Sequence, residues 1–312
     1  MVEINFQNMT ENPESNRNQV ASYSKPMVEI IKQRYSCRTY RPDPLDRDIR
    51  VKLADYAAGA QWGPLGSQAR FELIAASEND HKALKSLGTY GFIKGATGFI
   101  VGAIKESKYN LEDFGYLLEQ IIIYATDLGL GTCWLGGTFT KSSFAKKVSA
   151  REGELVPGVA SVGYIAKKPR RIESILKRND GTDRRLPWDR LFFDGEFNTP
   201  LPHEGLRKLG KVLEMVRLSP SASNRQPWRL VREGSTWHFY LQRTPGYRES
   251  PLVRLTTVAD LQRIDMGIAM SHFELTAYEL GLDGQWQNRD PEIERTDELT
   301  EYLVSWVGNN SQ

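Results

Sequence analysis

The 312-residue sequence predicts an α+β fold in which two similar halves pack around long buried helices. Helical segments alternate irregularly with short strand-like runs rich in β-branched and aromatic residues, which is typical of this class. Two segments, "NLEDFGYLLEQIIIYATDLGLG" (110–131) and "IDMGIAMSHFELTAYELGLD" (264–283), predict the buried centre. Their apolar residues recur nearly all round the helix, so no face is suited to water.

The same order of segments occurs twice along the chain. Asp113 and Asp265 open corresponding stretches at an offset of 152 positions, and both stretches end in Leu-Gly-Leu. Before each lies a helix, a Gly/Pro turn and a strand, with Pro64 and Pro220 at corresponding places. The period has the size of a domain, so an internal duplication is favoured over a solenoid of short repeats. Chance similarity remains the alternative for any single segment.

These elements divide the chain into four parts. Residues 1–25 form a polar arm, which is mobile or wraps a partner subunit. Residues 26–180 form the first half, with strands expected at 70–77, 98–104 and 158–166. Residues 181–200 belong to a polar, basic and proline-bearing connecting segment. Residues 201–312 form the second half, with a strand expected at 236–243.

Composition excludes several classes of protein. The formal net charge is +2 and no basic block dominates, which argues against a nucleic-acid or membrane partner. Nothing resembles a membrane span or a signal peptide. The only cysteines, Cys37 and Cys133, are too few and too far apart for a zinc pattern or a disulfide scaffold. A reducing cytoplasm is therefore the expected location.

Three short segments present groups that suit a phosphorylated, flat ligand. Arg34, Ser36 and Arg38 crowd "QRYSCRTYRPDP", where guanidinium and hydroxyl groups can bind phosphate or carboxylate; a solvated basic helix end is the alternative. "GLGTCWLGG" (129–137) allows close approach of the backbone to a flat ligand, or is a helix cap followed by a turn. "LSPSASNRQPWRLV" (218–231) is a polar loop between a helix and a strand.

Side chains that could perform chemistry on their own are not evident. The four histidines lie in unrelated contexts, no carboxylate pair has convincing spacing, and Cys133 has no nearby base. The combination predicts a cofactor that carries the chemistry itself.

Together these segments resemble the FMN-dependent nitroreductase family. "QRYSCRTYRPDP" resembles the family's opening motif, "SPSASNRQPWRLV" its Pro-Ser loop, "GLGTCWLGG" its third signature and "RRLPWDRLF" (184–192) its closing element. The resemblance covers most of the chain, apart from the arm and the last residues. It implies a nitroreductase-like fold, FMN as cofactor and NADH or NADPH as hydride donor. It also implies a small electron acceptor such as a nitroaromatic or a quinone, with no metal and no catalytic side chain.

The distribution of the motifs is similar to that in the family's tandem-fused branch. Only the first half has the opening motif, and only the second has the Pro-Ser loop. Ordinary members are homodimers that bind FMN between subunits, so the resemblance implies an internal pseudo-dimer with one shared site, for which a monomer suffices.

Residue by residue, the resemblance assigns FMN contacts to eleven positions. They are Arg34, Ser36, Arg38, Leu135, Gly136, Gly137, Arg185, Pro220, Ser221, Ala222 and Asn224. Arg184 is the neighbouring alternative to Arg185, and many relatives have glutamate where Gly136 stands. The amide of Asn224 is expected to bond the flavin or an acceptor, or to pin its own loop. A non-redox flavin-binding, flavin-processing or sensor protein of the same fold is the alternative function.

Overall fold

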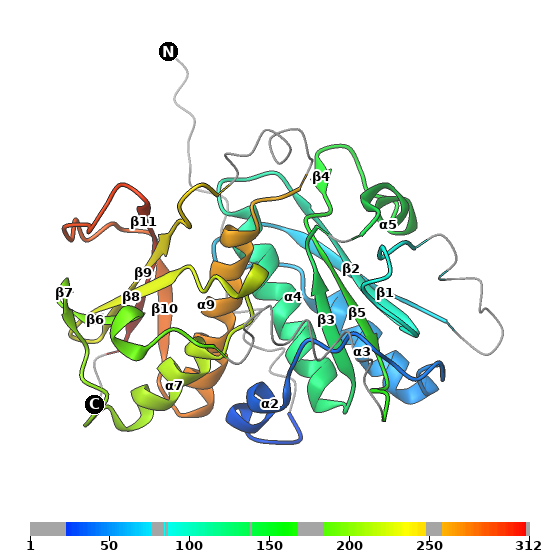
Figure 1. Cartoon of the computed structure of the whole chain (residues 1–312), viewed down its shortest axis with the longest axis horizontal. Helices are drawn as coiled ribbons and strands as arrows, with labels where there is room; N and C mark the ends of the chain where they lie inside the picture. The colour runs from blue at the N-terminus through cyan, green and yellow to red at the C-terminus, as the bar shows by residue number, and fades with distance from the viewer. Residues whose placement is uncertain are drawn as a thin grey trace, which may run out of the picture.

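The structure is a computed structural model that describes residues 23–76, 84, 87–137, 139–167, 184–247 and 258–309. Most of the expected arm and the start of the connecting segment lie outside the described residues. Two β-sheets lie on either side of a central pair of helices (Figure 1). The fold is therefore mixed α+β, as the sequence predicts.

The first sheet is antiparallel and is buried on both faces. One face packs with the central helices and the other packs against Phe144 of helix α5 (Lys141–Lys147). Helices α2 (Met27–Gln33) and α3 (Arg47–Gly59) precede the sheet in the chain. Its strands, in order across the sheet, are β1 (Ala69–Ala75), β2 (Gly98–Lys105), β5 (Val159–Gly163) and β3 (Gly131–Leu135), and the short β4 (Glu154–Leu155) also pairs with β2.

The second sheet repeats the strand order of the first. Its order is β10 (Gly284–Gln287), β11 (Thr300–Gly308), β9 (Thr236–Gln242), β8 (Trp228–Glu233), β6 (Phe192–Asp194) and β7 (Glu196–Pro200). If β4, β6 and β7 are left aside, four strands remain in each sheet. When these four are numbered by their order in the chain, they stand across the sheet as first, second, fourth and third; in the second sheet this order runs from β8 to β10. Residues 192–200 were expected in the connecting segment but form β6 and β7, because β6 pairs in parallel with β8.

Three short helical segments lie in the connecting segment and the second half of the chain. They are η1 (Trp188–Arg190), α7 (Arg207–Arg217) and η2 (Ala222–Asn224). Helix α7 packs on α9 through one apolar face, which includes Val212, Leu213 and Val216. The predicted strands are all found, with ends that shift by at most three residues.

The central helices α4 (Asn110–Asp127) and α9 (Leu261–Glu279) cross at two glycines. A methyl group on Gly115 would overlap the carbonyl oxygen of Ile264, and one on Gly267 would overlap the carbonyl oxygen of Glu112. The contact is reciprocal, because Ile264 and Gly267 lie 152 positions after Glu112 and Gly115. Glycine is therefore required here for close approach of the two backbones.

The ends of the central helices differ slightly from expectation. Helix α4 ends at Asp127, because Gly129 has a φ of +81° and Gly131 already begins β3. Helix α9 begins at Leu261, three residues before the predicted start. No helix among the described residues is long and apolar enough to cross a membrane. Both cysteines are buried and unbridged.

Gly267→Ala should destabilise the protein, even though alanine is more favourable than glycine inside a helix by about 1 kcal/mol. The added methyl group must separate two backbones, so we expect the free energy of unfolding to fall by about 2–4 kcal/mol in urea titrations. Gly210→Ala in α7 is the matched control, because its nearest heavy atom would be Leu206 Cβ at 3.4 Å. Equal stability of the two variants would contradict the proposed crossing.

Candidate functional site

The opening motif begins where helix α2 ends. The backbone N–H of Arg34 donates to the carbonyl of Ile30 at 3.0 Å, which closes the helix. The Arg34 side chain is only 6% exposed, and its Nε lies 3.8 Å from Glu119 Oε1. This Nε is buried and has no hydrogen-bond partner among the described residues. Arg38, four positions on, is also buried.

Strand β3 links the opening motif to the glycine segment. Ser36 bridges to Thr132 at the start of the strand, and the N–H of Cys37 donates to the Thr132 carbonyl at 2.8 Å. At the other end of the strand, the Leu135 side chain is buried in the core, so only its backbone is available to a ligand. Ser36 and Leu135 thus lie beside opposite ends of one short strand.

The glycines after β3 lie against the start of α9. A Cβ on Gly136 would approach Leu261 Cδ2 to 2.5 Å, while one on Gly137 would approach Val258 only to 4.0 Å. Gly137 is exposed. A side chain at position 136 would therefore have to displace Leu261, and with glycine at both positions the segment offers a ligand its backbone.

The Pro-Ser loop follows α7 and is held at the same end of α9. The N–H of Ala222 donates to both carboxylate oxygens of Asp265, at 2.9 and 3.1 Å. The Ser221 hydroxyl accepts from the N–H of Gln226 at 2.9 Å. Ser223 and Asn224 have positive φ values of 51° and 53°. Side-chain hydrogen bonds therefore fix a strained loop at the first turn of α9.

The closing element binds the same loop. Arg185 donates to the carbonyl oxygens of Ser219 and Leu218, at 2.6 and 2.8 Å, and to Asn224 Oδ1 at 3.3 Å. Asn224 Nδ2 donates to the carbonyl of Arg184 at 2.9 Å. The side chain of Asn224 therefore ties the Pro-Ser loop to the closing element. Arg185 likewise secures the loop.

A buried carboxylate connects the opening motif to the helix before the Pro-Ser loop. Glu119 of α4 faces Arg34, accepts from Trp134 Nε1 at 2.6 Å, and lies 2.9 Å from His272 Nε2 of α9. His272 Nδ1 in turn bonds the carbonyl oxygen of Met215 in α7 at 2.9 Å. The sequence did not single out Glu119. The available signal was a glutamate in the middle of a helix whose apolar residues recur nearly all round.

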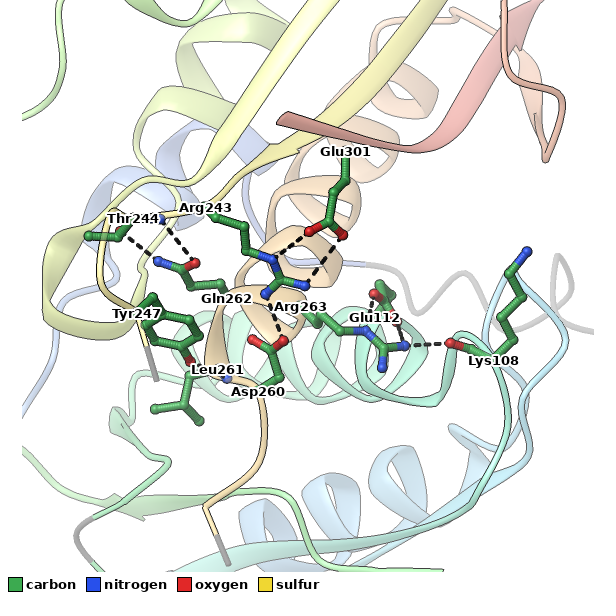
Figure 2. A network of polar contacts seen from close by, with 10 residues as sticks. All are labelled: Lys108, Glu112, Arg243, Thr244, Tyr247, Asp260, Leu261, Gln262, Arg263 and Glu301. Carbon is green, nitrogen blue, oxygen red and sulfur yellow. Dashed lines mark hydrogen bonds and ion pairs between the residues drawn. The ribbon is translucent and has the colours of Figure 1, made fainter. Parts of the chain in front are cut away.

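A cleft of about 390 Å³, named the second cleft because it lies on the side of the second sheet, is found at the same ends of the central helices. Figure 2 shows ion pairs lining it: Arg243 contacts Asp260 and Glu301, at 2.6 and 3.0 Å. Arg263 contacts Glu112 at 2.6 Å and the Lys108 carbonyl. Burial raises the pKa of Glu112, against the opposing effect of Arg263.

The second cleft corresponds to the glycine segment through the 152-residue offset. Tyr109, 152 positions before Leu261, accepts from the amide of Asn288, 152 positions after Gly136. The bulky polar side chains of Tyr109 and Asn288 therefore meet at the place that corresponds to the contact between Gly136 and Leu261. The two corresponding places differ in the space they leave.

Comparisons with known proteins identify the family. A family model described as "Putative TM nitroreductase" matches residues 26–277. This chain belongs to that nitroreductase family.

A Thermotoga maritima structure, described as a "putative nitroreductase", shares the fold with a TM-score of 0.55. It is 19% identical, and the match covers 91% of this chain and 94% of that one. A Bacteroides fragilis nitroreductase with bound FMN is 17% identical with a TM-score of 0.36, over 47% of this chain and 92% of its own. No curated protein matched the chain.

In this nitroreductase-family chain, the first half also has a loop held by an aspartate. Asp113 of α4 accepts from the N–H groups of Leu65 and Ser67, at 2.9 and 2.8 Å, as Asp265 accepts from Ala222. Burial raises the pKa of Asp113 to about 6, although these hydrogen bonds oppose the shift. Burial also raises the pKa of Asp265 well above its ordinary value.

The raised pKa of Asp113 predicts a pH-dependent stability. Between its ordinary pKa of 3.8 and about 6, the folded chain binds more protons at this group than the unfolded chain. The free energy of unfolding therefore increases as the pH falls below 6, and Asp113 contributes about 1 kcal/mol per pH unit to this increase. The stability of the native protein relative to Asp113→Asn should accordingly increase from pH 7 to pH 5 in urea titrations. A difference that stays constant or shrinks would contradict the assignment; Asp48→Asn, at an exposed site, is the matched control.

Proposed function

We propose that this chain is an FMN-dependent oxidoreductase that takes hydride from NADH or NADPH and passes electrons to a small acceptor such as a nitroaromatic or a quinone. The observation that carries the proposal is the guanidinium of Arg34. It stands in the family's opening motif, is almost fully buried, and has an Nε that lacks a hydrogen-bond partner among the described residues. A buried cation of this kind favours an anionic ligand.

The residues around Arg34 fit the phosphate of FMN. A phosphate monoester supplies negative charge and several acceptor oxygens, which match a guanidinium better than a single carboxylate at 3.8 Å does. The hydroxyl of Ser36 and the guanidinium of Arg38 belong to the same short segment. We therefore assign the phosphate to Arg34, Ser36 and Arg38.

The remaining predicted residues suit the flat part of the cofactor. The backbone of Leu135, Gly136 and Gly137 would face the ring; Gly137 is exposed, and a Cβ there would approach nothing closer than Val258 at 4.0 Å. The second half would contribute the loop of Pro220, Ser221, Ala222 and Asn224, and Arg185 would act by securing that loop. When bound, FMN supplies a ring that accepts hydride and passes electrons on. The protein's part is to bind this ring, orient it and limit its contact with water.

We further propose that the chain is an internal pseudo-dimer of two nitroreductase-like halves, 26–180 and 201–312, joined by residues 181–200. Three observations support it: the reciprocal glycine contacts of α4 and α9, the shared strand order of the two sheets, and the aspartate that holds a loop in each half. Because each site of such a dimer needs parts of both halves, a monomer would contain a complete site.

The pseudo-dimer has a single flavin site under this proposal. The counterpart position holds Tyr109 and Asn288, and the adjoining second cleft is lined by paired arginines and carboxylates. A flavin ring there would have to displace these side chains and separate the ion pairs of the cleft.

Anaerobic mixing with NADH or NADPH tests the oxidoreductase function directly. We expect the FMN-loaded protein to lose its visible flavin absorbance, and a quinone added afterwards to restore it. A protein that binds FMN but stays oxidised with both nucleotides would instead be a non-redox flavin-binding, flavin-processing or sensor protein.

Arg34→Ala should weaken FMN binding selectively. Charge-assisted hydrogen bonds contribute about 1.5–3 kcal/mol each, so FMN affinity should fall by about ten- to a hundredfold in titrations of the flavin-free protein. Riboflavin lacks the phosphate and should be affected far less. Equal losses for FMN and riboflavin would mean that Arg34 supports the fold instead.

A further inference from the structure

Glu119 lies at the centre of a buried cluster that joins four elements. Its side chain is completely buried, and so is that of His272. The carboxylate contacts Arg34 after α2, Trp134 in β3 and His272 in α9. Through His272 the cluster extends to the Met215 carbonyl in α7. Burial of a carboxylate costs desolvation free energy unless its hydrogen-bond and charge partners offset that cost, so a functional role for Glu119 is worth considering.

The hydrogen bonds of Glu119 and His272 determine how many protons this pair of side chains carries. A carbonyl oxygen only accepts, so His272 Nδ1 must carry a hydrogen toward Met215. The 2.9 Å contact between His272 Nε2 and Glu119 Oε1 needs one more hydrogen, on the ring or on the carboxyl group. With either placement, Glu119 and His272 together are neutral. The charge of Arg34 then leaves these three side chains with a net charge of +1.

We infer that Glu119, supported by His272 and Trp134, is the positioning residue that holds Arg34 for the FMN phosphate. The inference rests on the proposed function. The contact of Glu119 with the Nε side of Arg34 restricts a long side chain whose Nε has no hydrogen-bond partner among the described residues. The net positive charge of the cluster is what a phosphate would complement. Glu119 touches no ligand itself and acts through Arg34.

Glu119→Gln separates positioning from net charge. The amide oxygen of the variant can accept from Trp134, and its NH₂ group can donate to a neutral His272 ring whose Nδ1 still donates to Met215. The cluster then keeps its net charge of +1 with Arg34. What is lost is the contact of the carboxyl oxygen Oε1 with Arg34, so any change in phosphate preference reports on orientation.

The test compares the dissociation constants of FMN and riboflavin for the flavin-free full-length chain. Native protein should prefer FMN, and Glu119→Gln should lower that preference by about tenfold, since fixing the rotamers of a long side chain accounts for a factor of this order. Riboflavin affinity should change little. A preference within about twofold of the native value in a folded Glu119→Gln protein would overturn the inference.

Two further variants keep the test decisive. Glu274→Gln is the matched control: this carboxylate is also buried between the central helices, where it accepts from Tyr116 and Tyr278, while the carboxylate described beside Arg34 is that of Glu119. It should leave the FMN-to-riboflavin preference unchanged, and an equal loss in this variant would make the Glu119 effect a general result of helix packing. Trp134→Phe, which removes one donor to Glu119, should lower the preference by about threefold. If Glu119→Gln does not fold, an unchanged preference in Trp134→Phe overturns the inference.

The failure of this inference can be distinguished from the failure of the proposed function. Native protein that does not bind FMN would overturn both. Native protein that prefers FMN, and loses the preference in Arg34→Ala but not in Glu119→Gln, would overturn only the role of Glu119.

Discussion

The arrangement of the whole chain depends on the crossing of α4 and α9 at Gly115 and Gly267. Because neither glycine has a side chain, the two helix backbones approach to a distance that any Cβ would prevent. Residues one or two turns along can then reach across the interface, as Glu119 does to His272 and Arg263 does to Glu112. Each helix also supports one sheet, so the crossing sets how the two sheets face each other.

In the proposed pseudo-dimer, the two regions that correspond to each other across this crossing have different side chains. On one side, Gly136 and Leu261 leave backbone exposed beside a loop that Asp265 holds. On the other, Tyr109 and Asn288 meet, and arginine–carboxylate pairs line the adjoining cleft (Figure 2). A symmetric homodimer could not assign different residues to its two sites. A fused chain can, so one site can specialise while the other strengthens the contact between halves.

Much of the fold follows from sequence patterns because the patterns are local. The apolar character of the two long helices and the 152-residue offset predict the central pair, and β-branched runs predict strands of the first sheet. The outer strands β6 and β7 could not be predicted, because β7 pairs with β6, and β6 pairs with β8, whose residues lie 38 positions further along the chain. A polar, proline-bearing segment gives no local sign of such pairing.

The site is predictable in its motifs and much less so in its contacts. The opening motif, the glycine segment and the Pro-Ser loop are recognisable as short sequences, and α9 and β3 bring them toward one region. The contacts of Arg185 are not recognisable, because carbonyl and phosphate oxygens both accept from a guanidinium and only the fold decides between them. Glu119 and His272 are missed for a related reason: a polar residue in a buried helix has no distinguishing neighbours in the sequence.

The central claim is a single FMN site that both halves build, and a crystal structure of the FMN-loaded protein tests it most directly. The account predicts one FMN per chain, with its phosphate at Arg34, Ser36 and Arg38 and its ring beside Gly136 and the loop of Pro220 to Asn224. A second FMN in the cleft lined by Arg243 and Arg263, or one FMN that contacts only the first half, would contradict it.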